Sequence, residues 1–131
     1  MILDSSAVVA ILGKEPGWDK LAAALNMADT VSVSSATYLE ISIVIGGRKD
    51  PVMNRELDSL FEQFDVVIEP FTAEHAEIAR QAYRDFGRGS GHAANLNFGD
   101  CFAYALARAK RQPLLYKGDD FRHTDLRSAV S

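Results

Sequence analysis

The chain contains 131 residues, of which 47% are hydrophobic and 24% are charged, a composition typical of one compact globular domain. It has no run of about eighteen uncharged apolar residues and no basic segment before an apolar one, so neither a membrane span nor a secretory signal is predicted. The formal charge of −4 disfavours nucleic acid as a partner, unless acidic side chains gather around divalent cations that reverse the local charge. We expect a single domain over residues 1–131 and, because Cys101 is the only cysteine, a cytoplasmic protein without an internal disulfide.

Strand-like and helix-like apolar runs follow one another through the first half of the chain. In order, we predict a strand at 1–3, helices at 7–12 and 18–28, a strand at 30–34, and helices at 36–45 and 51–64. Ser5 or Ser6 is expected to cap the first helix, and the Gly46-Gly47 pair is expected to end the helix at 36–45.

The second half continues this alternation. We predict a buried strand at 66–68, a helix at 73–86 capped by Thr72, a flexible glycine-rich loop at 87–92, a helix at 99–111, a strand at 113–116, a turn at 117–120 and a fifth strand at 126–130. Because helices separate the strands, the connections must be crossovers, which build parallel sheets. The predicted fold class is therefore α/β, with a mainly parallel sheet of four to five strands covered by helices on both faces.

Acidic residues follow two of the predicted strands and open one of the helices. Asp4 leaves the first strand, Asp119 and Asp120 leave the fourth, and Asp100 begins the helix that precedes it. In open α/β sheets, ligands bind outside the carboxyl ends of the strands, so these carboxylates are expected to meet at one edge. Each residue also has an ordinary explanation, since Asp4, Asp119 and Asp120 suit tight turns and Asp100 suits the positive end of a helix dipole.

Glu40 lies on a face of its predicted helix that is otherwise apolar. It shares this face with Ala36, Ile43, Val44 and Gly47, where an uncompensated carboxylate is costly. A metal ion, a cation or hydrogen bonds would offset that cost. The alternative is a capping box, in which Thr37 and Glu40 have the required three-residue offset.

Several carboxylates at one place would repel one another unless a cation joined them. Hard oxygen ligands suit Mg²⁺ or Mn²⁺, which keep some waters and bridge to substrate phosphates. The chemistry that such a site favours is the hydrolysis of a phosphodiester, with the metal activating water and stabilising the charge that develops on the phosphate and the leaving oxygen.

With these acids in view, the chain resembles the PIN-domain family and, within it, the VapC toxins of bacterial toxin–antitoxin pairs. The segments that carry the resemblance are Met1–Ala7 (MILDSSA), Ser35–Glu40 (SATYLE), Asn97–Cys101 (NFGDC), and Leu114–Phe121 (LLYKGDDF) with Thr124-Asp125 after it. Their order and spacing cover almost the whole chain, so the set is far more specific than any one segment.

The resemblance implies a three-layer α/β/α sandwich and a Mg²⁺-dependent endoribonuclease, with Mn²⁺ as an alternative ion. It assigns Asp4, Glu40 and Asp100 as metal-binding and catalytic acids, with either Asp119 or Asp120 as the fourth and Asp119 slightly favoured. It also implies that the Ser6 hydroxyl orients the first aspartate or a metal-bound water.

The same resemblance describes the partners. The enzyme would be the toxin of a type II toxin–antitoxin system, inhibiting translation and growth when it is free of a VapB-type antitoxin. Family members are usually dimers, and transfer RNA or ribosomal RNA is the substrate that the family implies. The helix at 36–45 carries apolar residues around its whole circumference, which fits burial by a partner as well as burial within the monomer.

Four basic residues are candidates for a rim that contacts RNA phosphates: Arg48, Arg84, Arg88 and Lys117. Ordinary solvated surface charge is the alternative for each of them. Two other functions also remain open. A phosphatase that uses an aspartyl nucleophile would fit Asp4, although such enzymes place a second acid where this chain has Ser6, and a non-catalytic regulator would bind RNA or antitoxin without cutting.

Overall fold

A four-stranded parallel sheet lies at the centre of the computed structural model, which describes residues 1–130. The strands are β1 (Ile2–Leu3), β2 (Ser32–Ser34), β3 (Val67–Glu69) and β4 (Leu114–Leu115), in the order β3-β2-β1-β4. Every pair in the sheet is parallel, and Ile2 lies opposite both Ser32 of β2 and Leu114 of β4. The crossover connections that a parallel sheet requires are helical, as the alternation of the sequence predicted.

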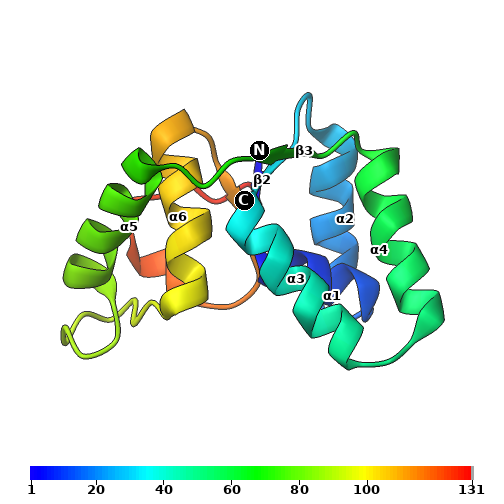
Figure 1. The fold of residues 1–131 in the computed structure, drawn as a ribbon, viewed down its shortest axis with the longest axis horizontal. Coiled ribbons are helices and arrows are strands. Elements are labelled where there is room, and N and C mark those ends of the chain that lie inside the picture. The colour runs from blue at the N-terminus through cyan, green and yellow to red at the C-terminus, as the bar shows by residue number, and fades with distance from the viewer. Residues whose placement is uncertain (131) are drawn as a thin grey trace.

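Within residues 1–130, six α-helices cover the two faces of this sheet. They are α1 (Ser5–Leu12), α2 (Trp18–Met27), α3 (Ser35–Gly47), α4 (Pro51–Gln63), α5 (Ala73–Phe86) and α6 (Phe98–Lys110), and a short 3₁₀ helix follows β4 at Asp120–His123. Helices α1 to α4 lie on one side and α5 and α6 on the other (Figure 1). The three-layer α/β/α arrangement predicted from the resemblance is therefore confirmed.

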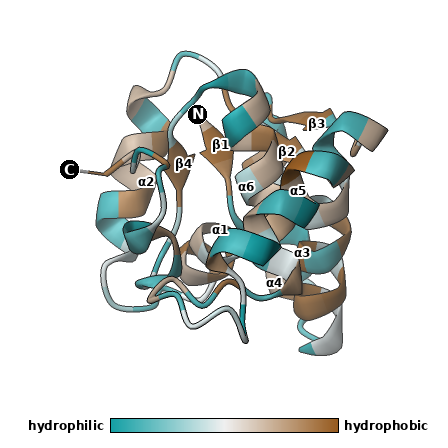
Figure 2. Cartoon of the chain, turned by 90° about the vertical axis from the view of Figure 1, so that its left-hand side faces the viewer, coloured by the Kyte–Doolittle hydropathy of each residue, from teal (hydrophilic) through white to brown (hydrophobic). Residues whose placement is uncertain are grey.

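The alternation of side chains along the strands divides the core into two parts. Leu3 and Leu115 point into the cluster formed with α1 to α4, whereas Ile2 and Leu114 point into the cluster formed with α5 and α6. All four side chains are fully buried. Figure 2 shows β1 and β4 in the hydrophobic colour, as expected for strands of a parallel sheet that is covered on both faces.

Three details differ from the sequence predictions at the borders of this sheet. Residues 126–130 form no fifth strand, because their pairing with β4 is limited to a single bridge between Leu114 and Ser128. The strand predicted as buried at 66–68 is instead an edge strand, so Val67 and Ile68 are 52% and 43% exposed. Helix α3 includes Gly46 and Gly47, and Arg48 is its C-cap, because two glycines lower helix stability without forbidding the helical conformation.

The first helix begins earlier than predicted, and this change concerns an acidic residue. Asp4, rather than Ser5 or Ser6, is the N-cap of α1, and its carboxylate accepts a hydrogen bond from the Ser6 backbone N–H at 3.0 Å. Thr72 caps α5 as predicted, accepting a hydrogen bond from the His75 N–H. None of the helices within residues 1–130 combines the length and the apolar composition needed to cross a membrane.

Candidate active site

Asp4 is held at the carboxyl end of β1, in the centre of the sheet. Its backbone N–H donates a hydrogen bond to the Leu115 carbonyl of β4 at 3.0 Å, and its side chain is only 2% exposed. One carboxylate oxygen, Oδ2, caps α1. The other, Oδ1, is buried and has no hydrogen-bond partner. A buried carboxylate oxygen without a partner is costly, so its presence calls for a ligand that the protein itself does not supply.

Glu40 has a second oxygen of the same kind, and it comes from α3. Its Oε1 is buried without a hydrogen-bond partner. The carboxylate packs against Gly99 in the first turn of α6, where an added Cβ would lie 2.9 Å from the Glu40 Cδ atom. The capping-box alternative is wrong, because α3 begins at Ser35 with Ser34 as its N-cap, so Thr37 lies inside the helix.

Asp100 is fixed by a reciprocal pair of hydrogen bonds at the start of α6. Its Oδ2 accepts from the Asn97 backbone N–H, and its own N–H donates to the Asn97 side-chain oxygen, both at 2.9 Å. Asp100 is 9% exposed. An acid at the positive end of the helix dipole is expected in the first turn, so the dipole explains the position of Asp100 in sequence. The dipole does not explain why Asp100 is buried near other acids.

Asn97 and Gly99 are two residues of the site to which the sequence analysis gave no role. Asn97 could have been identified from the sequence, because the Asn-x-x-Asp spacing of Asn97 and Asp100 is typical of a capping box. Gly99 has no such signal, because its importance depends on a contact with Glu40 on another helix.

The adjacent Asp119 and Asp120 point in different directions. The Asp119 carboxylate lies 3.7 Å from the Arg122 guanidinium, and its side chain is 77% exposed. Asp120 instead lies close enough to Asp100 for its negative charge to raise the pKa of Asp100. The structure thus brings Asp120, and not Asp119, to the other acids.

Burial and the charges of neighbouring acids raise the pKa values of two of these carboxylates. Burial raises the pKa of Asp4 to about 6, and the negative charge of Glu40 contributes to the rise. Burial also raises the pKa of Asp100 to about 7, with contributions from Asp4 and Asp120. The charges of Glu40, Asp4, Asp100 and Asp120 are thus linked in a chain across this edge of the sheet. A bound cation would relieve both the burial and the repulsion.

The acids do not form a complete metal cage. Within residues 1–130, no group of three or more histidine, cysteine, aspartate or glutamate side chains is arranged to enclose an ion. Mg²⁺ is usually held by one or two carboxylates together with waters and substrate phosphates, and its binding to these acids stays a prediction.

Ser6 joins α1 to the turn after β4, and the four candidates for the basic rim have different surroundings. The Ser6 hydroxyl accepts a hydrogen bond from the Lys117 N–H at 2.9 Å, and its closeness to the Asp4 carboxylate opposes the rise in the pKa of Asp4. Among the rim candidates, Arg48 lies beside Met53, Arg84 bonds to Gln81, Lys117 pairs with Glu15, and the exposed Arg88 begins the loop after α5.

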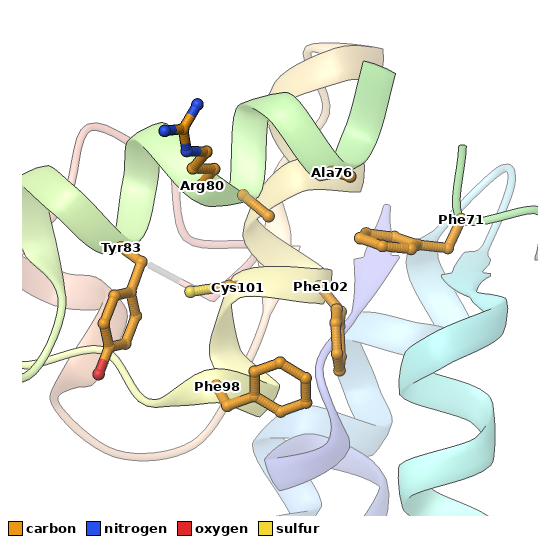
Figure 3. Close-up of a pocket in the computed structure, with 8 residues that line it drawn as sticks. Phe71, Ala76, Arg80, Tyr83, Phe98, Cys101 and Phe102 are labelled. Carbon is orange, nitrogen blue, oxygen red and sulfur yellow. The ribbon is translucent and has the colours of Figure 1, made fainter. Parts of the chain in front are cut away.

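An apolar surface borders the acids. It consists of two hollows, each of about 320 Å³, that share Phe98 and Phe102 of α6. One is walled by α5 residues, with Phe71 at its end, as Figure 3 shows. The other runs along α3 past Leu39 and Ile43 to Glu40. Phe98, Ile43 and Leu39 are 77%, 64% and 59% exposed, so the surplus of apolar surface predicted for the helix at 36–45 is present.

Comparisons with known proteins agree with this fold. Residues 1–126 match the PIN domain family. The chain is 52% identical to "Ribonuclease VapC28" of Mycobacterium tuberculosis over 99% of this chain and 98% of that protein, and 44% identical to "Ribonuclease VapC42" of the same species over the whole of both. In fold it is similar to the crystal structure of VapBC2 from Rickettsia felis bound to a promoter DNA fragment, with a TM-score of 0.75, 18% identity, and coverage of 97% of this chain and 95% of that chain.

An α/β/α sandwich with acidic residues gathered at the carboxyl ends of its strands defines the class of protein. The chain belongs to the PIN-domain family and, within it, to the VapC proteins.

Proposed function

We propose that the chain is a Mg²⁺-dependent endoribonuclease and the toxin of a type II toxin–antitoxin pair. The observation that supports the proposal most strongly is the pair of unpartnered, buried carboxylate oxygens on Asp4 and Glu40 beside the buried Asp100. The relatives that are 44% and 52% identical over nearly the full chain carry the name ribonuclease. Acting in the cytoplasm on transfer RNA or ribosomal RNA, such an enzyme would inhibit translation and arrest growth.

The donor set fits Mg²⁺, and Mn²⁺ as its nearest substitute. Asp4 and Glu40 each offer a free, buried oxygen, Asp100 is held beside them, and Asp120 faces Asp100 from the turn after β4. All are hard carboxylate oxygens, and no softer ligand is needed. When bound, Mg²⁺ supplies activation of a water molecule and neutralisation of charge on the phosphodiester.

The chain's own residues hold these donors in place before substrate arrives. The Ser6 backbone N–H fixes one oxygen of Asp4, so the other remains directed into the cluster. The Asn97 N–H fixes one oxygen of Asp100 in the same way. Placing the acids at the start of α1 and α6 directs the positive ends of two helix dipoles toward them, which favours negative charge there. Such preorganisation is what a hydrolase needs to position a phosphate and a water.

The direct test is cleavage of total RNA by the purified chain with Mg²⁺, with Mn²⁺ and with EDTA. We expect cleavage that requires the metal and that falls at least about a thousandfold in Asp100→Asn, which keeps the size of the side chain while removing its charge. Circular dichroism would verify that the variant is folded. Binding of RNA without cutting would instead identify a non-catalytic regulator, and sequencing the cleaved ends would identify the RNA target.

A second prediction concerns the contact between Gly99 and Glu40. Gly99→Ala places a methyl group where the Glu40 carboxylate lies, so that carboxylate must swing away from Asp4 and Asp100. We expect cleavage to fall at least about tenfold, because a small misplacement of a catalytic group has a large effect on rate. Stability should stay within about 1 kcal/mol of the original, because alanine favours the helix that glycine disfavours. Unchanged cleavage would show that Glu40 is not needed at its present position.

The apolar surface is where we propose that a VapB-type antitoxin binds. It continues to Glu40, so a chain lying on it would also cover the acids and keep RNA away. Phe98→Glu should abolish co-purification with the cognate antitoxin, because Phe98 belongs to both hollows. Val52→Glu is the matched control, since Val52 is a 53% exposed residue of α4, outside both hollows.

The homodimer stays a prediction, and the same two variants test it. Light scattering of the chain purified without antitoxin would report its mass. A dimer that dissociates in Phe98→Glu and persists in Val52→Glu would show that a second copy uses the same apolar surface as the antitoxin. Antitoxin binding that survives in Phe98→Glu would place the antitoxin elsewhere.

A further inference from the structure

The turn that carries Asp120 is exposed, and its position must be set by its two ends. At one end, Phe121 is buried in the core beneath α6. At the other end, Lys117 leaves β4 and is followed by Gly118, whose φ of 102° lies in the left-handed region that glycine adopts readily. Asp119 and Asp120 between them are exposed. What fixes Lys117 therefore determines where Asp120 lies.

Lys117 is attached to the α1 segment at two points. Its backbone N–H donates to the Ser6 hydroxyl at 2.9 Å, in the first turn of α1. Its side-chain Nζ donates to Glu15 Oε1 at 2.9 Å, just beyond the end of α1. The same helix begins at Asp4. One residue thus joins the turn that bears Asp120 to both ends of the helix that Asp4 caps.

The ion pair is too exposed to matter much for the stability of the whole fold. The Lys117 and Glu15 side chains are 34% and 37% exposed, and pairs of this kind contribute little to global stability. Its effect must then be local. A tie between positions that are 102 residues apart in sequence limits the movement of a glycine-containing turn that has little other support.

We propose that Glu15 and Lys117 are positioning residues, whose ion pair holds the turn at 117–120 against α1 so that Asp120 faces Asp100. The inference rests on the proposed function, because it assumes that Asp120 serves the metal site. It also gives the Lys117 ammonium a role inside the protein, in place of the contact with RNA that the sequence analysis considered.

The test compares Glu15→Gln and Lys117→Met with the original chain. Each variant should weaken the binding of Mg²⁺, measured by calorimetry, by about fivefold, the effect expected of one partly exposed ion pair. Each should also speed the hydrogen exchange of the amides in residues 118–121. The double variant Glu15→Lys with Lys117→Glu, which reverses the pair, should restore both properties toward those of the original.

A second ion pair of similar exposure provides the control. Lys110 Nζ lies 3.0 Å from Glu69 Oε1, with side chains 36% and 26% exposed, and Lys110→Met should leave Mg²⁺ binding and the exchange of residues 118–121 unchanged. If Lys117 instead contacted RNA, Glu15→Gln would free its ammonium and lower KM without lowering kcat. That result would overturn the proposal, as would Mg²⁺ binding in Glu15→Gln and Lys117→Met equal to that in Lys110→Met.

The hydrogen-exchange measurement separates failure of this inference from failure of the proposed function. If the chain neither binds Mg²⁺ nor cuts RNA, the proposed function is wrong, and Asp120 has no metal site to which it could contribute. Slow exchange in residues 118–121 that persists in both single variants contradicts the positioning role itself, whatever the activity of the chain.

Discussion

Asp120→Asn is expected to slow RNA cleavage about a hundredfold or more, whereas Asp119→Asn should change the rate by less than about threefold. The two residues are adjacent and chemically identical, so the difference must come from geometry. Asp120 faces Asp100 and raises its pKa, and its charge therefore belongs to the acidic cluster. Asp119 is directed at Arg122 and is mostly exposed to solvent. Asparagine keeps the size of each side chain and removes only its charge.

The measurement is the initial cleavage rate of one defined RNA over a range of Mg²⁺ concentrations. If Asp120 contributes to ion binding, part of the loss in Asp120→Asn should be recovered at high Mg²⁺. Thermal unfolding of both variants controls for damage to the 3₁₀ helix that follows. A greater loss in Asp119→Asn than in Asp120→Asn would mean that the turn rearranges when metal and RNA bind.

The sequence alone could not decide whether Asp119 or Asp120 is the fourth acid of the site. Asp4, Glu40 and Asp100 were selected because strand ends and helix faces are local patterns, and a parallel sheet brings strand ends to one edge. The fourth acid depends on the path of one turn. Gly118 signals a turn with a positive φ, but the sequence does not show how this turn and the 3₁₀ helix that begins at Asp120 orient the two carboxylates.

The N-cap of α1 was mistaken for a related reason. The sequence prediction starts the helix at Ala7, which places the cap at Ser5 or Ser6, whereas the helix starts at Ser5 and is capped by Asp4. A carboxylate has two oxygens, and the structure uses one for each purpose: Oδ2 caps the helix and Oδ1 remains free. A sequence pattern gives a residue one role, whereas the two oxygens of Asp4 have different environments.

The fold was predictable to the level of its layers, and its borders were not. Parallel strands buried on both faces have continuous apolar sequences that are easily recognised. Whether residues 126–130 extend the sheet depends on a competing local interaction. Ser128 Oγ bonds within its own turn, to the N–H and the carbonyl of Val130, and the segment pairs with Leu114 of β4 at one bridge only.

The second large effect is expected in the absence of metal. Asp4→Asn should raise the free energy of unfolding of the metal-free chain at pH 8 by about 3 kcal/mol, the equivalent of a pKa raised from 3.8 to about 6. The cause is chiefly the burial of a charged carboxylate, with a contribution from Glu40. Asparagine is as good an N-cap as aspartate, so the hydrogen bond from the Ser6 N–H is retained.

The direction of the pH dependence follows from the raised pKa. Below the ordinary pKa of 3.8, Asp4 is protonated in both the folded and the unfolded chain, so its ionisation does not oppose folding. Between pH 3.8 and about 6, the unfolded chain has released this proton while the folded chain keeps it, so stability falls with rising pH until the folded chain also carries the buried charge above about 6. The advantage of Asp4→Asn should therefore be small near pH 4 and fully developed at pH 8.

Urea unfolding in EDTA at pH 4 and pH 8 measures this difference, with the exposed Asp29→Asn as a control that should match the original chain at both values. Adding Mg²⁺ at pH 8 should then stabilise the original chain more than Asp4→Asn, because a ligand that binds only the folded state shifts the equilibrium toward it. A variant that is less stable than the original at pH 8 without metal would show that the Asp4 carboxylate has a partner inside the protein. If the Asp4 carboxylate destabilises the metal-free protein and stabilises the Mg²⁺-bound protein, its burial at this position is explained by binding of the ion.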